Sequence, residues 1–292
     1  IKRAARPGYK GFQLGKLSKT KTKYHKLKNY PENTDIIVNY AYDNTLPRAY
    51  GGTAVADSRF VNILLQHSLI ALPDNNFTPR FDDPRVGYFT TRVNDMTTSD
   101  AVNYRDLVHR WHLVKKNPEL ELSEPIEPLV YWIENTTPVA LRNLIKEGVE
   151  SWSLAFESAG FKNAVQVKIQ PDDADWDAGD IRYNVLRWTS SPKPPFGGYG
   201  PSFVNPKTGE ILGADIMLEW VYITKRIQQG ELFENTALFL DVENPMDAHY
   251  CSASALMQSN NLFAQSAVDA MELSEAAKET LIRESLRRLV LH

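Results

Sequence analysis

Residues 129–169 read LVYWIENTTPVALRNLIKEGVESWSLAFESAGFKNAVQVKI, and this stretch decides the fold of the second half of the chain. It opens with a run of five apolar residues that predicts a buried strand, after which Thr137 and a following proline predict a helix start. Apolar residues then recur at helical spacing across 141–159, and Gly160 is a typical C-terminal stop. Residues 165–169 predict another strand. The stretch therefore predicts a strand, a crossover helix and a strand in one mixed sheet.

The rest of this half continues the pattern. Residues 182–189 predict a strand, a Pro- and Gly-rich loop follows, and strands over 201–205 and 210–218 flank a Pro-Lys-Thr-Gly turn. A final helix is predicted over 274–292, with Ser274 as N-cap and an apolar stripe that includes Leu286. This half is expected to contain one sheet with helices packed on it.

The first half lacks helical stripes. Its apolar segments, such as 36–40 and 60–72, are short and separated by turn residues, which favours an antiparallel sheet or sandwich. We therefore expect an α+β protein with a β-rich domain at 1–115, a Pro- and Glu-rich linker at 116–127, and a mixed-sheet and helix domain at 128–292.

Composition limits the classes of function. The 292 residues carry a formal charge of −3, which argues against a protein built around nucleic acid. Residues 1–28 nevertheless hold ten basic and no acidic side chains, so this end could contact acidic lipid, nucleic acid or the acidic remainder of the chain. No apolar run approaches the length of about 18 residues that a transmembrane helix needs.

Two local clusters are candidate metal sites. His109 and His112 are three positions apart in a segment with strand character, where their rings would point to opposite faces, so a metal pair is not expected. Asp173, Asp175 and Asp177 resemble the start of a calcium loop, but Ala178 and Asn184 stand where an EF-hand needs Gly and Glu. A solvated acidic turn is favoured at 173–180, and calcium stays the alternative.

Longer segments carry a resemblance to a family. The sequence resembles the large bacterial zinc-dependent metalloproteases whose metzincin-like catalytic part follows a β-rich domain of undefined role. The segments that carry it are His67 to Pro73, Phe81 to Phe89, Tyr131 to Asn135, Ala155 to Phe161 and Gly200 to Leu212.

The resemblance implies specific roles for residues near the C-terminal end. It implies that the final helix leads into a His-Glu-x-x-His motif, with His292 as the first zinc ligand and the other ligands beyond residue 292. It also implies an edge strand that pairs with an extended peptide or protein substrate. The substrate-binding residues would be Gly200, Pro201, Ser202, Phe203 and Val204. No catalytic residue falls within the chain itself.

The implied function is zinc-dependent endopeptidase activity in the intact parent protein, in a periplasmic or extracellular location. The 292-residue chain is predicted to be inactive, because a catalytic zinc needs three protein ligands. Two alternatives stay open at this point. The chain could be a non-catalytic binding or regulatory module, or a pseudoprotease of the bacterial envelope. For His292, a cationic side chain at a frayed helix end is the simpler structural interpretation.

Overall fold

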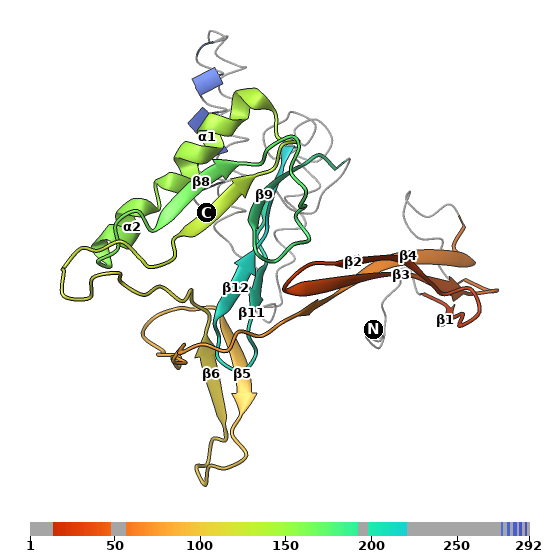
Figure 1. Ribbon diagram of the computed structural model, residues 1–292. Helices are drawn as coiled ribbons and strands as arrows, with labels where there is room; N and C mark the ends of the chain where they lie inside the picture. The colour runs from red at the N-terminus through yellow and green to blue at the C-terminus, as the bar shows by residue number, and fades with distance from the viewer. Residues whose placement is uncertain are drawn as a thin grey trace, which may run out of the picture. The chain divides into compact units, whose positions relative to one another are not determined.

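The computed structural model describes residues 14–47, 57–191 and 198–220, together with eight helical positions near the C-terminal end. Those eight positions are Ala276, Glu279, Thr280, Arg283, Glu284, Leu286, Arg287 and Val290. The chain divides into two compact units, Ile1–Pro73 and Asp74–His292. Figure 1 labels both helices and most of the strands.

The first unit contains one antiparallel sheet. Strands β1 (Lys16–Leu17), β2 (Lys23–Asn29) and β4 (Phe60–Ile70) all pair with β3 (Asn33–Asp43). The central strand supplies the buried side chains Val38 and Ala41. It also buries Asp35, whose carboxylate accepts a hydrogen bond from Nε2 of Gln66 at 3.0 Å. The antiparallel β structure predicted for the N-terminal part of the chain is confirmed here.

The second unit begins with a two-stranded hairpin and a looped segment. Strands β5 (Thr90–Asn94) and β6 (Tyr104–Val108) pair antiparallel. The predicted linker, residues 116–127, lies inside this unit and bonds to it: the N–H of Ser123 donates to the carbonyl of Gly160 at 3.1 Å. The expected domain boundary at residue 115 stays a prediction.

A five-stranded sheet forms the centre of the second unit, in the order β10-β13-β9-β7-β8. Strands β13, β9, β7 and β8 run parallel, and β10 is the antiparallel edge strand. Helices α1 (Val139–Glu150) and α2 (Ser153–Ser158) lie between β7 and β8 in sequence. The strand bounds are β7 Leu129–Ile133, β8 Val165–Ile169, β9 Asn184–Thr189, β10 Gly198–Tyr199 and β13 Ile216–Glu219.

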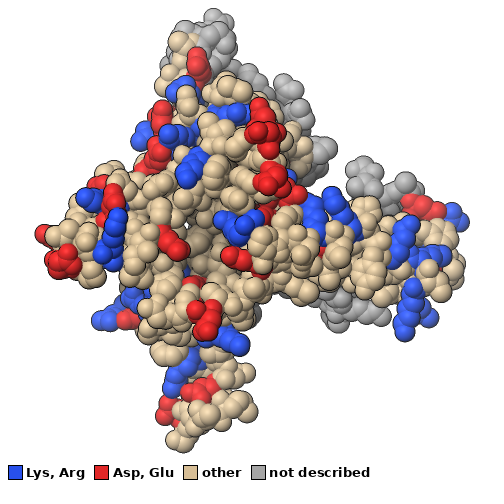
Figure 2. Space-filling view, in the orientation of Figure 1, with Lys and Arg blue, Asp and Glu red and all other residues tan. Residues whose placement is uncertain are grey.

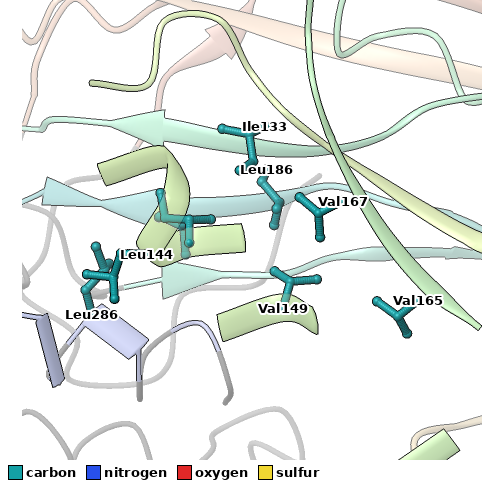
Figure 3. Close-up of a cluster of buried hydrophobic side chains, with 9 residues drawn as sticks. Ile133, Leu144, Val149, Val165, Val167, Leu186 and Leu286 are labelled. Atoms are coloured by element: carbon teal, nitrogen blue, oxygen red, sulfur yellow. The ribbon is translucent and has the colours of Figure 1, made fainter. Parts of the chain in front are cut away.

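The core lies between α1 and one face of this sheet. Alternate residues of β7 and β9 point to this face, including Ile133 and Leu186, and the buried side of α1 adds Ile145. Leu286, from the helical positions near the C-terminal end, is 1% exposed and packs into the same cluster (Figure 3). The predicted mixed sheet with a crossover helix is confirmed, and the protein is broadly α+β.

The long predicted helix differs in detail. Its N-cap is Pro138 without a side-chain cap, and Thr137 is buried instead, so the predicted Thr137 cap was wrong. The helix also divides at Ser151, whose Oγ donates to the carbonyl of Gly148 at 2.6 Å. There the backbone changes to a shorter repeat, with Trp152 N–H on the carbonyl of Val149. Gly160 ends the segment at φ +87°, as predicted.

None of the described helices is long and apolar enough to span a membrane.

Candidate functional site

The predicted substrate-binding segment lies at an edge. Strand β10 pairs only with β13, and β11 (Ser202–Val204) pairs antiparallel with β12 (Ile211–Ala214) in a separate two-stranded sheet. Among the described residues each of these strands has a single neighbour. The five predicted residues, 200–204, therefore follow one continuous edge.

Backbone hydrogen bonds show which groups face outward along this edge. The carbonyl of Pro201 accepts from the N–H of Asp215 at 3.2 Å, and the N–H of Asn205 donates to the carbonyl of Glu210 at 2.8 Å. In a strand the bonding direction alternates from residue to residue. Gly200, Ser202 and Val204 consequently direct their N–H and C=O groups away from β12, and no backbone partner meets them in the described part of the chain.

Strands β10 and β11 are separated at Gly200 and Pro201 for a chemical reason. Pro201 has no N–H to return to Asp215, so one rung of the ladder is missing where the two strands separate. The side chain of Asn184 bonds to the side of β12 that faces away from β11. Oδ1 of Asn184 accepts from the N–H of Ala214 at 2.9 Å, and Nδ2 of Asn184 donates to the carbonyl of Val130 at 3.0 Å. Asn184 thereby fastens the β11–β12 pair to the main sheet.

The turn after β11 is rigid and matches the predicted Pro-Lys-Thr-Gly turn. Oδ1 of Asn205 accepts from the N–H of Lys207 at 3.0 Å, and Gly209 adopts φ +81°. A Cβ at Gly209 would lie 2.4 Å from the carbonyl oxygen of Val108, so the position needs glycine on two grounds. The turn thus holds a fixed position against the end of β6.

Glu210, which follows this turn, is a buried carboxylate. It is 5% exposed, and its Oε1 lies 2.7 Å from Nδ2 of Asn75 and 3.5 Å from Nδ1 of His112. Its Oε2 and the Nε of Arg110 are both buried without a hydrogen-bond partner in the described structure. Burial lowers the pKa of Arg110, Arg80 acts in the same direction, and Glu210 opposes the shift.

His109 and His112 have different partners in the structure. His109 Nε2 lies 2.8 Å from Thr91 Oγ1, and burial lowers the pKa of His109. His112 instead packs edge-on against Phe77 at a ring distance of 5.5 Å. The strand predicted through both residues was wrong, because β6 ends at Val108. Beyond it, Arg110 forms an isolated parallel bridge with Glu210 instead.

A second buried carboxylate belongs to Glu219, the last residue of β13. Glu219 is 1% exposed and accepts hydrogen bonds from the N–H of Ser191 at 2.8 Å and from its Oγ at 2.9 Å. Thr189 Oγ1 donates to the same carboxylate at 3.0 Å. The sequence pattern assigned no role at this edge to Glu219, Glu210 or Asn184. The alternation of polar and apolar residues on the strands gives no sign that Glu219 and Glu210 are buried or that Asn184 bonds to two other segments.

The predicted metal sites are placed as follows. His292 lies outside the described residues. In the acidic turn, Asp177 Oδ1 accepts from the N–H of Gly179 at 2.9 Å, and Asp180 pairs with Arg182 at 2.6 Å. No group of three or more His, Cys, Asp or Glu side chains among the described residues could hold a metal ion.

Comparison with known proteins gives one family match. Residues 2–116 match the model of a domain of unknown function, DUF5117, whose description names no activity. No curated protein and no solved structure matches the chain.

Proposed function

We propose that this chain binds an extended peptide along β10 and β11, and that the intact parent protein hydrolyses the bound peptide as a zinc-dependent endopeptidase. The observation that carries the proposal is the outward direction of the backbone groups of Gly200, Ser202 and Val204. Unpaired N–H and C=O groups at a sheet edge form a template for an added strand.

Peptide binding follows from residues of this chain alone. An extended peptide beside β11 would exchange backbone hydrogen bonds with Ser202 and Val204, each worth about 0.5–1.5 kcal/mol net. The missing N–H of Pro201 does not deprive the peptide of a hydrogen-bond donor, because the nitrogen of Pro201 faces β12. Asn184 and the turn at 205–210 hold the edge in place before the peptide arrives. This preorganisation reduces the entropy lost on binding.

The hydrolytic part of the proposal rests on the resemblance described above. The order of β7, α1 and β8, and the hairpin-like return from β11 to β12, support it. A bound zinc ion would supply Lewis-acid activation of water. The described residues do not supply a zinc site, so the role assigned to them is to bind and orient the peptide. A periplasmic or extracellular location belongs to the same proposal.

A non-catalytic peptide-binding module is the second candidate. The same open edge favours it, because strand addition at β11 needs no metal. The two candidates differ only in what happens to the peptide after it binds.

Two variants of Ser202 test the binding edge. Ser202→Pro removes the outward N–H, whereas Ser202→Ala keeps it and serves as the matched control. With a fluorescence-labelled, blocked casein-derived peptide, we expect Ser202→Pro to weaken binding about tenfold or more and Ser202→Ala to leave it within twofold. Equal binding by both variants would reject the proposed edge.

Hydrolysis is tested separately on the intact parent protein. Cleavage of a fluorescence-quenched peptide with added zinc, abolished by a chelator and restored by zinc, is the expected result. Binding without any cleavage under these conditions would reject the peptidase and retain the non-catalytic module.

A further inference from the structure

The sheet of the first unit has one face that carries both lysines and exposed apolar side chains. Residues that pair across neighbouring strands direct their side chains to the same face of a sheet. Two rows on this face begin with a lysine in β1 or β2, cross β3, and end with a large apolar residue in β4. The rows are Lys16–Asp43–Phe60 and Lys23–Asn39–Leu64.

A bulge in β2 brings further lysines to this face. The pairing with β3 skips His25, so Lys23 and Lys26 point to the same face although they are three positions apart. Lys28 follows on this face two positions later, and the intervening Leu27 points to the opposite face. Lysines therefore extend along the whole β1–β2 side of the sheet. We call the face that carries them the lysine face.

The carboxylates of the first unit do not neutralise this charge. Its described part contains seven Lys and Arg side chains and four Asp and Glu side chains, a net charge of +3. Two of the four carboxylates bond to other basic side chains, in the pairs Asp43–Lys21 at 2.9 Å and Asp57–Arg59 at 2.8 Å. Asp35 is buried, and Glu32 lies in the connection between β2 and β3.

Several ammonium groups on the lysine face are consequently available to a partner. Lys16, Lys23 and Lys26 are exposed, and none of them has a carboxylate within ion-pair distance among the described residues. On the side of the first unit that Figure 2 shows, basic side chains predominate over acidic ones. Charge complementarity therefore favours an anionic partner.

The apolar end of each row indicates what kind of anionic partner fits. Phe60 and Leu64 are 55% and 57% exposed. Nζ of Lys21 lies 4.9 Å from the centre of the Phe60 ring, and the guanidinium carbon of Arg59 lies 5.9 Å from it. Since neighbouring strands are about 4.8 Å apart, the ends of each row lie about 10 Å from each other. The lysines and the apolar residues can therefore contact one flat surface.

We infer that the lysine face binds the surface of a bilayer that contains anionic phospholipids. Lipid phosphates lie against the lysines of β1 and β2, and Phe60 and Leu64 enter the apolar layer beneath the headgroups. A bilayer supplies negative charge and an apolar phase together. A nucleic acid supplies phosphates but no apolar phase that would cover Leu64. The inference concerns the first unit and does not rest on the peptide proposed for β11.

Sedimentation of the 292-residue chain with lipid vesicles tests the inference. One set of vesicles contains phosphatidylcholine alone, and the other contains equimolar phosphatidylcholine and phosphatidylglycerol. We expect the chain to bind the second set only, and less of it to bind as the salt concentration rises. Equal binding to both sets would overturn the inference. Absence of binding to both sets at low salt would also overturn it.

Two double variants show whether the lysine face is the surface that binds. Lys23→Gln with Lys26→Gln is expected to weaken binding to the anionic vesicles about twentyfold, because each lysine near such a surface contributes about fivefold. Lys116→Gln with Lys162→Gln removes the same charge from exposed positions of the second unit and should leave binding within about twofold of the wild type. Equal losses in both double variants would contradict a role for this face.

Two exposed leucines on opposite faces of the sheet test the apolar contribution. Leu64→Asn is expected to weaken vesicle binding about tenfold. Leu27→Asn, at a position 66% exposed on the opposite face, is the matched control and should bind like the wild type. A larger loss in Leu27→Asn would place the bilayer on the opposite face and overturn the inference. Tighter binding to a single-stranded DNA oligonucleotide than to the anionic vesicles, unchanged in Leu64→Asn, would identify a nucleic acid as the partner and would also overturn it.

Discussion

Nδ2 of Asn75 donates a hydrogen bond of 2.7 Å to Oε1 of Glu210, although 135 positions of sequence separate the two residues. The bond connects the start of the second unit to the turn that follows β11. It also gives a partner to one oxygen of a carboxylate that is buried from water. A buried charge that loses a partner is costly, so this contact stabilises the region beside the candidate peptide edge.

Asn75→Ala is expected to lower the free energy of unfolding by about 1–3 kcal/mol, because Oε1 of Glu210 keeps only the distant imidazole of His112. Urea titration followed by tryptophan fluorescence measures the effect. Asn76→Ala removes a neighbouring asparagine whose side chain makes no such bond, and it should change stability by no more than about 0.5 kcal/mol. Equal losses in both variants would contradict a specific role for the Asn75 contact.

Asn184→Ala should loosen the candidate edge as well as the sheet. The variant removes the acceptor for the Ala214 N–H and the donor to the Val130 carbonyl, so we expect a loss of about 1–3 kcal/mol. Amide exchange at Ala214 should accelerate. Asn184→Asp keeps the acceptor alone, and its Ala214 amide should stay protected. If exchange at Ala214 is as slow in Asn184→Ala as in the wild type, the side chain does not hold the hairpin.

Gly148→Ala is expected to destabilise the protein, although alanine is the better helix former by about 1 kcal/mol. A Cβ at this position would lie 2.9 Å from Cγ1 of Val290, so α1 would have to move away from the helical segment that contains Val290. The double variant Gly148→Ala with Val290→Ala provides room for the new methyl group. Its loss in free energy of unfolding should be smaller than the sum of the losses in the two single variants. A double-mutant cycle measured by thermal unfolding would show this difference. Strict additivity would mean that the two helices do not touch there.

The phenol of Tyr131 should lose its proton at a higher pH than an exposed tyrosine does. Burial raises the pKa of its phenol from 10.0 to about 12. The unfolded chain would therefore lose this proton first, and stability should fall as pH rises from about 10 to 12, with no contribution from Tyr131 at lower pH. Phenolate absorbance measured against pH reports the titration directly. Tyr131→Phe should lack the late absorbance step and show a shallower loss of stability, whereas removal of absorbance near pH 10 by this substitution would refute the burial effect.

Much of the second-unit sheet could be predicted because its signals are local. The near-continuous apolar run at 129–133 and the strand at 165–169 appear in the structure with the predicted bounds. The helix break at Ser151 could not be foreseen, because it depends on a side-chain bond to Gly148 that competes with the helical repeat. One predicted strand, 210–218, divides at Asp215 because Pro201 on the facing strand lacks an N–H.

Some parts of the candidate site could likewise be predicted from the sequence, and others could not. Turn chemistry and proline identify the edge strand at 201–204, since both act through the local backbone. The residues that hold it, Asn184 and Glu210, come from distant segments, and only the three-dimensional arrangement shows their partners. The position of β8 at the edge of the sheet could not be predicted either, because strand order decides which strand lacks a neighbour.

Leu286 completes the cluster that begins at Ile133 and includes Leu144 and Leu186. During synthesis, the ribosome must therefore release the chain as far as Leu286 before this apolar surface is covered. Until then the nascent sheet exposes its face to water and to other nascent chains, a situation in which chaperones are needed. A stop codon between residues 220 and 286 should accordingly yield aggregated rather than soluble product.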